Sequence, residues 1–133
     1  MMPAIRIRNI SEKMDREHDG LRIAVTRFVP RGIRKTRYHF WMPNLAPSEP
    51  LLAAFQNKKI SWKTFSQRYR QELFEPASID KGNATIKNYG QKFTLRMLKA
   101  LAKKQPITLL CTCSPDADDC HRILLKQILE RKI

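Results

Sequence analysis

A short apolar segment near the end of the chain constrains the fold more than any other stretch. In Ile107–Thr112 nearly every residue is apolar or β-branched. Such a run is typical of a strand that is covered on both faces of a parallel sheet. An acidic turn follows, in which Asp118 or Asp119 is expected to cap a last helix over Cys120–Lys132.

Earlier segments supply the other parts of an α/β fold. Alternation of isoleucine with arginine predicts a strand over Ala4–Ile10 with one wet face, and a second strand is expected over Leu21–Phe28. Capping hydroxyls predict helices that begin after Ser48 and Ser61, and an amphipathic helix is expected over Phe93–Lys104. This order of strands and helices predicts one layered α/β domain over the whole chain.

Helical spacing also predicts which side chains face the core. In the helix after Ser61, the expected core stripe is Trp62, Phe65, Tyr69 and Leu73. In the later amphipathic helix, the expected inward residues are Phe93, Met97, Leu98 and Leu101. Between these helices, Glu75–Gln91 contains few large apolar residues and is expected to form a long loop.

The charge of the chain favours anionic partners. It has 26 Lys and Arg against 12 Asp and Glu, a formal net charge of +14. Such a field attracts polyanions or anionic small molecules without naming one. Apolar runs of ~18–20 residues are absent, so no membrane span is expected. The alternating N-terminus is not typical of a signal peptide, and an odd, crowded set of three cysteines suits a reducing compartment, so we expect a cytoplasmic protein.

Three chemically active side chains stand together at the expected start of the last helix: Cys120, His121 and Arg122. In open α/β sheets, ligands bind beyond the carboxyl ends of strands and beside helix N-termini. A helix N-terminus and Arg122 would stabilise a thiolate on Cys120, whereas the aspartates of the turn oppose it. His121 is a candidate acid–base group, and Cys111 is an alternative thiol.

A second group of candidates follows the second strand. Arg27 and Arg31 are expected to converge with His121 and Arg122 in an anion pocket, with Gly32 freeing the backbone after the strand. Such a pocket would suit phosphate or carboxylate oxygens. The alternative is that Arg27 or Arg31 pairs with an aspartate of the acidic turn and holds the two loops together.

A metal site is less well supported. Cys111, Cys113, Cys120 and His121 could be counted as four zinc ligands. The C-x-C spacing on a strand is poor for a tight metal knuckle, and adjacent Cys and His on a helix diverge by about 100°. We therefore expect no metal and no cofactor, and buried inert thiols are the alternative.

Nucleic-acid binding is a separate function that the sequence leaves open. After the second strand a basic loop is expected, which also holds Tyr38, Phe40 and Trp41. These rings could stack on bases while Lys and Arg neutralise phosphates. Helix-turn-helix, zinc-finger and RNP signatures are missing. The sequence does not distinguish a third possibility, a protein–protein adaptor.

The stretch Gly20–Gly32, GLRIAVTRFVPRG, resembles the opening signature of the YeaO-like branch of the domain-of-unknown-function 488 family. Three further stretches match in the same order: Trp41 with Leu45–Ser48, Phe65–Glu72, and Thr108–Cys111 with Cys120–Arg122. The resemblance covers nearly the whole chain. It implies a single Rossmann-like α/β domain with a small, mostly parallel sheet flanked by helices, and it implies no established activity.

The resemblance also selects residues. Arg27, Pro30, Arg31 and Gly32 match the family motif after the second strand, and Cys111, Cys120, His121 and Arg122 match its C-terminal motif. Thr26 stands where the family often has Asp, which weakens an enzymatic interpretation. The combined prediction is binding of an anionic, phosphate-bearing ligand at the strand ends, with Cys and His chemistry possible. The substrate, the reaction and the oligomeric state are left open.

Overall fold

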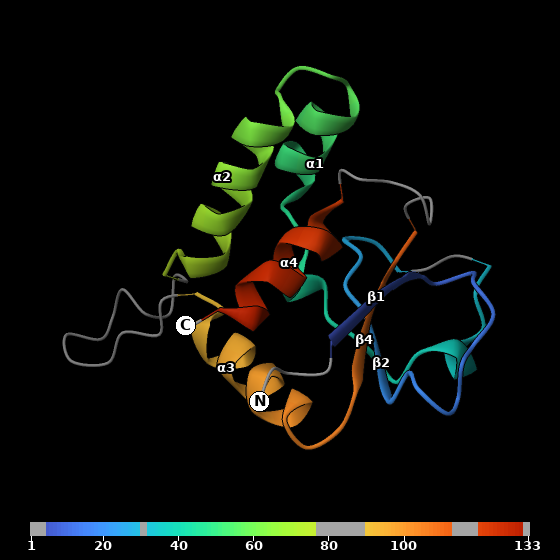
Figure 1. Ribbon diagram of the computed structural model, residues 1–133. Helices are drawn as coiled ribbons and strands as arrows, with labels where there is room; N and C mark the ends of the chain where they lie inside the picture. Colours follow the sequence, from blue (N-terminus) through green and yellow to red (C-terminus); the bar gives the residue numbers. More distant parts are fainter. Residues whose placement is uncertain (1–4, 30–31, 77–89, 113–119, 132–133) are drawn as a thin grey trace.

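The computed structural model describes residues 5–29, 32–76, 90–112 and 120–131 (Figure 1). The described strands form one sheet in the order β1-β4-β2-β3, and every neighbouring pair is parallel. This confirms the predicted small α/β fold. The elements in chain order are β1 (Ile5–Asn9), β2 (Leu21–Ala24), the 3-10 helix η1 (Lys35–Arg37), β3 (Phe40–Trp41), the 3-10 helix η2 (Pro43–Leu45), α1 (Glu49–Gln56), α2 (Trp62–Phe74), α3 (Lys92–Ala102), β4 (Ile107–Cys111) and α4 (His121–Glu130).

Strand β4 lies inside the sheet and is buried along its whole length, as its apolar sequence predicts. It pairs with β1 on one side and β2 on the other. The register places Cys111 beside Asn9 of β1, and Leu110 beside Ala24 of β2. Because the three strands run in the same direction, their carboxyl ends form one edge of the sheet. The N-terminus of α4 returns to this edge.

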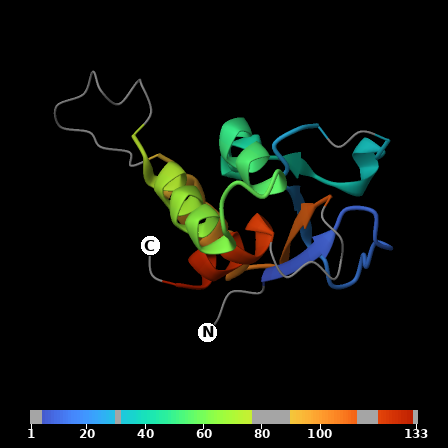
Figure 2. The ribbon, with the colours of Figure 1, turned by 90° about the horizontal axis from the view of Figure 1, so that it is seen from above.

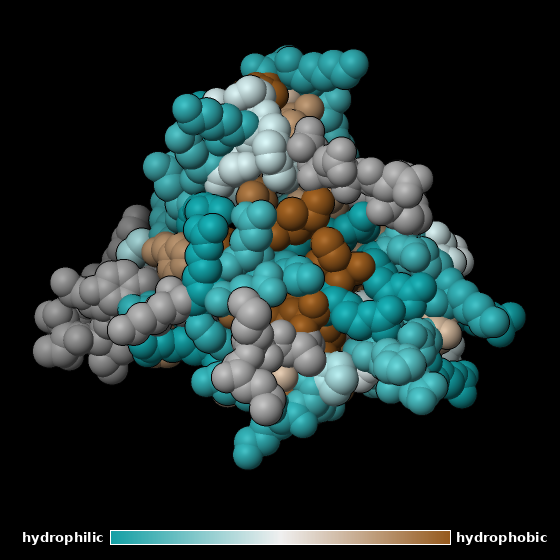
Figure 3. All heavy atoms as spheres, viewed as in Figure 1, coloured by the Kyte–Doolittle hydropathy of each residue, from teal (hydrophilic) through white to brown (hydrophobic). Residues whose placement is uncertain are grey.

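The helices form their core on one face of the sheet. Alternate residues of the strands, including Ile23 and Leu109, pack in a single cluster with buried residues of α1, α2, α3 and α4. In both ribbon views α4 lies between α2 and β1 (Figure 2). On this side the surface is mostly hydrophilic, and its largest group of apolar side chains lies near the centre, over α4 and the neighbouring strand (Figure 3). Phe65, Tyr69 and Leu73 of α2 are buried, which confirms that part of the predicted stripe.

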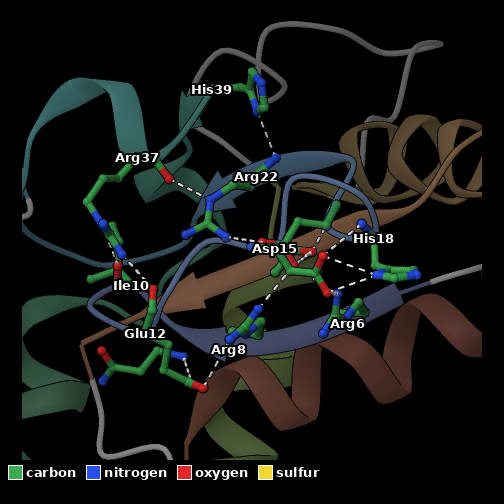
Figure 4. Close-up of polar contacts among 12 residues, drawn as sticks. Arg6, Arg8, Ile10, Glu12, Asp15, His18, Arg22, Arg37 and His39 are labelled. Carbon is green, nitrogen blue, oxygen red and sulfur yellow. Dashed lines mark hydrogen bonds and ion pairs between the residues drawn. The ribbon is translucent and has the colours of Figure 1, made fainter.

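The opposite face of the sheet carries charged side chains around one buried carboxylate (Figure 4). Asp19, whose side chain is 1% exposed, accepts from Arg6 Nη1 at 3.0 Å and Arg8 Nη1 at 3.4 Å. Arg22 Nη1 also donates to its carboxylate. Thr108 Oγ1 donates to the Asp19 backbone carbonyl at 2.7 Å. The face predicted to be wet is thus half-buried, because the segment after β1 folds back over it.

Further contacts attach η1 to the same face. Arg22 Nε donates to the carbonyl oxygen of Arg37 at 2.6 Å, and Arg37 Nε donates to that of Ile10 at 3.3 Å. Gly20 lets the covering segment enter β2. It adopts a φ of +60°, and a Cβ there would lie 1.9 Å from the carbonyl oxygen of Pro106. This position therefore requires glycine.

Two strand predictions are wrong in detail. Strand β2 ends at Ala24 rather than at Phe28. Just beyond this end, Thr26 Oγ1 donates to the carbonyl of Phe28 at 2.7 Å. This local side-chain bond turns the backbone away from the ladder. The segment Phe40–Trp41, expected in a loop, forms the short edge strand β3 beside β2.

The expected inward face of α3 is also wrong in part. Phe93 and Met97 are 52% and 51% exposed, whereas Leu95, Leu98 and Ala102 are buried. The helix sequence contains two apolar stripes, and only the one that meets α4 is covered. The loop predicted over Glu75–Gln91 lies mostly outside the described residues.

Replacement of the buried carboxylate tests the charged face. Although burial raises it, the pKa of Asp19 is lowered overall by the Asp15 N–H bond and the Arg22 charge. The stability that the Asp19 carboxylate gives to the folded protein is therefore complete above the ordinary Asp pKa of ~3.9. It is lost as the pH falls through the lower pKa of Asp19 in the folded state. Asp19→Asn should reduce the free energy of unfolding by about 3–5 kcal/mol, since it leaves buried arginine uncompensated.

The measurement is urea unfolding at neutral and acidic pH. Asp15→Asn is the matched control, because that side chain is 35% exposed, and its effect should be much smaller. Equal effects of the two variants would contradict a stabilising role for the buried carboxylate.

Candidate functional site

Two cysteines meet where β4 ends and α4 begins. Cys111 is the last residue of β4, and Cys120 occupies the N-cap position of α4. Their sulfur atoms lie 3.2 Å apart, and the residues are only 1% and 2% exposed. Cys120 was expected inside the helix behind an Asp118 or Asp119 cap. Instead it stands at the cap position without a side-chain capping bond, and both aspartates lie outside the described residues.

A buried arginine contacts one of these sulfurs. Arg122 Nη1 donates to Cys111 Sγ at 2.8 Å, and the arginine is 2% exposed. A guanidinium is always charged, and its removal from water costs several kcal/mol unless negative charge compensates it. Glu12 is one such charge: its pKa is lowered chiefly by the Asn9 N–H bond, and Arg122 contributes. The contact with Cys111 supplies a second position where negative charge is favoured.

His121 is held in one tautomer. Its Nε2 lies 2.6 Å from the carbonyl oxygen of Val25, and since a carbonyl only accepts, Nε2 must carry the hydrogen. Tyr69 packs edge-on against the imidazole, with ring centroids 5.8 Å apart, and its hydroxyl donates to Leu45 O at 2.6 Å. Burial raises the pKa of Tyr69, and the carboxylate of Glu72 raises it further, so the hydroxyl remains a protonated donor.

Arg27 lies at a neighbouring cavity of about 260 Å³. Its Nη2 donates to the carbonyl of Pro43. The carboxylate of Glu72 faces the same cavity and accepts from the Ser48 N–H at 2.8 Å and the Ser48 hydroxyl at 2.5 Å, which joins α2 to the start of α1. With Glu75 also in its lining, the cavity presents one cation and two carboxylates.

The expected site residues are thus brought together only in part. Cys111, Cys120, His121 and Arg122 form one buried group. Arg27 makes its described contact at the cavity instead. The backbone of Gly32 adopts a φ of +72°, with open space where a Cβ would be. The predicted residues Arg31 and Cys113, and the aspartate partners proposed for the loops, lie outside the described residues.

Sequence reasoning did not identify Tyr69 and Glu72 as parts of the site. Tyr69 was placed in the core, where its ring does lie. A tyrosine hydroxyl at a core position needs a hydrogen-bond partner, and this requirement is the signal by which Tyr69 could have been found. Glu72 carried no such signal, because its partner Ser48 is 24 residues away and belongs to another helix.

The described part of the chain also bears on metals and membranes. Within it, no three His, Cys, Asp or Glu side chains gather as a group that could hold a metal ion. None of the helices described is both long enough and apolar enough to cross a bilayer.

Comparison with known proteins identifies relatives of similar size. The profile of DUF488-N3a, described as the active DUF488-N3 subclade, matches residues 5–133. The uncharacterized protein YeaO of Escherichia coli K12 is 35% identical over 96 residues, which cover 71% of this chain and 70% of that protein. The uncharacterized protein Rv3073c of Mycobacterium tuberculosis H37Rv is 32% identical over 77 residues, 56% of this chain and 64% of that protein. No solved structure matches the chain significantly.

Removal of one hydroxyl tests the packing beneath the thiols. Tyr69→Phe keeps the ring against His121 but leaves the buried carbonyl of Leu45 without its donor, so it should lower the free energy of unfolding by about 1–3 kcal/mol. Denaturant titration measures this effect. Tyr38→Phe is the control, since Tyr38 is only partly buried and packs against a separate small cluster. A Tyr69→Phe protein as stable as the control would show that the carbonyl finds another donor.

Proposed function

The chain belongs to the DUF488-N3a family, and we propose that it binds an anionic, phosphate-bearing ligand at the carboxyl edge of the sheet and acts on it through a thiolate of Cys111. One observation carries this proposal: the 2.8 Å contact between Arg122 Nη1 and Cys111 Sγ inside a buried site. The description of the matched family as an active subclade agrees with a chemical role.

The contact favours Cys111 over Cys120 as the charged sulfur. A thiolate, and not a thiol, is the nucleophile, and a nearby guanidinium stabilises it. Cys120 lies within 3.2 Å, where its S–H can donate to the Cys111 sulfur. The interpretation from sequence placed the better nucleophile at Cys120. The geometry supports an exchange of roles, with Cys120 as the donor to Cys111.

The ligand class follows from charge and from the cavity lining. The net charge of +14 attracts anions to the whole molecule, and Arg27 offers a guanidinium at the cavity. Glu72 and Glu75 line the same cavity and would repel a ligand that is only anionic. The arrangement therefore suits a ligand that carries hydrogen-bond donors beside its phosphate, for which the carboxylates are acceptors.

Alkylation by iodoacetamide, followed residue by residue with mass spectrometry, tests the thiolate. Cys111 should be labelled well below the ordinary thiol pKa of ~8.5, and Arg122→Gln should move its profile to higher pH by about one to three units. Arg131→Gln, an exposed position after α4, is the control and should change nothing. Labelling of Cys111 only in the ordinary range, unchanged by Arg122→Gln, would overturn the proposal.

The same measurement with added phosphoethanolamine, whose ammonium group supplies donors beside its phosphate, tests the ligand. Phosphoethanolamine should slow the labelling of Cys111, and Arg27→Gln should remove that protection without shifting the pH profile. Protection that survives Arg27→Gln would place the anion elsewhere.

A second candidate function, nucleic-acid binding, is favoured by exposed aromatic side chains. Phe28, Phe40 and Trp41 are 59%, 51% and 37% exposed. Trp41 Nε1 donates to the carbonyl of Thr26 at 2.9 Å, which fixes the indole beside the end of β2. The exposed cations Arg34 and Lys35 lie in the preceding segment. Aromatic rings flanked by cations form the kind of surface on which single-stranded nucleic acid stacks.

A salt titration tests this second function. Fluorescence anisotropy of a labelled single-stranded oligonucleotide should show log affinity falling against log salt by about 0.7 for each phosphate contacted. Phe40→Ala should weaken binding, whereas Phe93→Ala, at an equally exposed position on α3, should not. A salt-independent response, or equal effects of both variants, would exclude this function.

A further inference from the structure

We propose that Cys111 and Cys120 are a redox-active pair that reduces small hydroperoxides and becomes a disulfide in doing so. This inference rests on the Cys111 thiolate of the proposed function, but not on the identity of the anionic ligand. It adds a second reaction to the same site and assigns a role to Cys120.

The geometry of the pair needs little change for a disulfide to form. The two sulfur atoms are 3.2 Å apart, and a disulfide bond is about 2.05 Å long, so they must approach by roughly 1 Å. One sulfur stands at the end of an internal strand and the other at the N-cap of a ten-residue helix. Both anchors belong to the packed core, so the sulfurs face each other before any oxidant arrives.

The proposed reaction has two steps. The Cys111 thiolate attacks the terminal oxygen of the hydroperoxide: an S–O bond forms, the O–O bond breaks, and the leaving oxygen takes a proton from solvent to become water or an alcohol. Cys120 then gives up its proton and attacks the Cys111 sulfur: an S–S bond forms, the S–O bond breaks, and hydroxide leaves with that proton as water. The two thiols supply two electrons, and two equivalents of a low-molecular-weight thiol restore them.

Arg122 determines which form of the pair is favoured. In the reduced form the guanidinium lies against a negatively charged Cys111 sulfur. In the disulfide that charge is gone, and the buried cation loses a compensating partner. A pair whose reduced form is stabilised in this way is easily reduced, unlike a structural disulfide.

Burial limits the oxidant. Both cysteines are at most 2% exposed, and the neighbouring His121 packs against Tyr69 in the core. Hydrogen peroxide is therefore expected to react faster than a bulky aromatic hydroperoxide. At 3.2 Å apart the two sulfurs are not joined by a disulfide in this structure, as the reduced form requires.

The experiment uses the full chain with Cys113→Ser, so that two thiols remain. Hydrogen peroxide at equimolar concentration should lower the intact mass by two hydrogen atoms and link the peptides that carry Cys111 and Cys120, and reduced glutathione should reverse both changes. With Cys120→Ser added, the reaction should stop at one oxygen on Cys111, which dimedone traps.

Glutathione redox buffers then measure the role of Arg122. Arg122→Gln should stabilise the disulfide about tenfold or more in the equilibrium, the change that one unit of thiol pKa represents. Arg122→Lys keeps a positive charge and should shift the thiol–disulfide equilibrium less. This variant replaces Arg122→Gln in the measurement if Arg122→Gln does not fold. Arg131→Gln, at the exposed position after α4, is the control and should leave the equilibrium unchanged.

The outcomes separate this inference from the proposed function. If Cys111 is alkylated at low pH but peroxide yields no Cys111–Cys120 link, the inference of a redox-active pair is wrong, whereas the proposed Cys111 thiolate is supported. If Cys111 is alkylated only in the ordinary range and no link forms, both are wrong. If a link forms but Arg122→Gln leaves its equilibrium unchanged, the sulfurs are merely close, and the inference is overturned.

Discussion

Parallel pairing of β4 on both of its sides is the constraint on which the rest of the structure depends. Because β1 and β2 run alongside it in the same direction, Asn9, Ala24 and Cys111 end at one edge of the sheet. Helix α4 begins at this same edge, where Cys120 and Arg122 lie beside the end of β4. The site is a consequence of strand direction, as in other open α/β sheets.

Two buried arginines, one on a face of the sheet and one at its edge, are compensated by different groups. Arg22 is buried on one face and Arg122 at the edge, and each must keep a permanent charge away from water. Arg22 pairs with the carboxylate of Asp19, which can do little but accept hydrogen bonds. Arg122 donates to the sulfur of Cys111, which would be both a counter-charge and a nucleophile as the proposed thiolate. The first pairing serves the fold, whereas the proposed chemistry rests on the second.

The elements that could be predicted from the sequence are those specified by patterns within a few neighbouring residues. The buried strand over Ile107–Cys111 and the helix starts after Ser48 and Ser61 were confirmed, because apolar continuity and capping hydroxyls act within a few residues. The face of α3 was mistaken, because Phe93 and Leu95 are equally apolar and only the position of α4 selects between them. The early end of β2 was missed as well.

The sequence by itself determined the small α/β architecture, the family and the candidate cysteine, histidine and arginine at the start of α4. Local hydrogen bonding and the periodicity of apolar side chains suffice for the architecture, and the order of the motifs suffices for the family. Only the tertiary structure decided that Arg122 contacts Cys111, that Asp19 gathers three arginines, and that Glu72 joins the start of α1. Each of these contacts depends on strand register or helix packing, which bring together groups that have no reason to be paired along the chain.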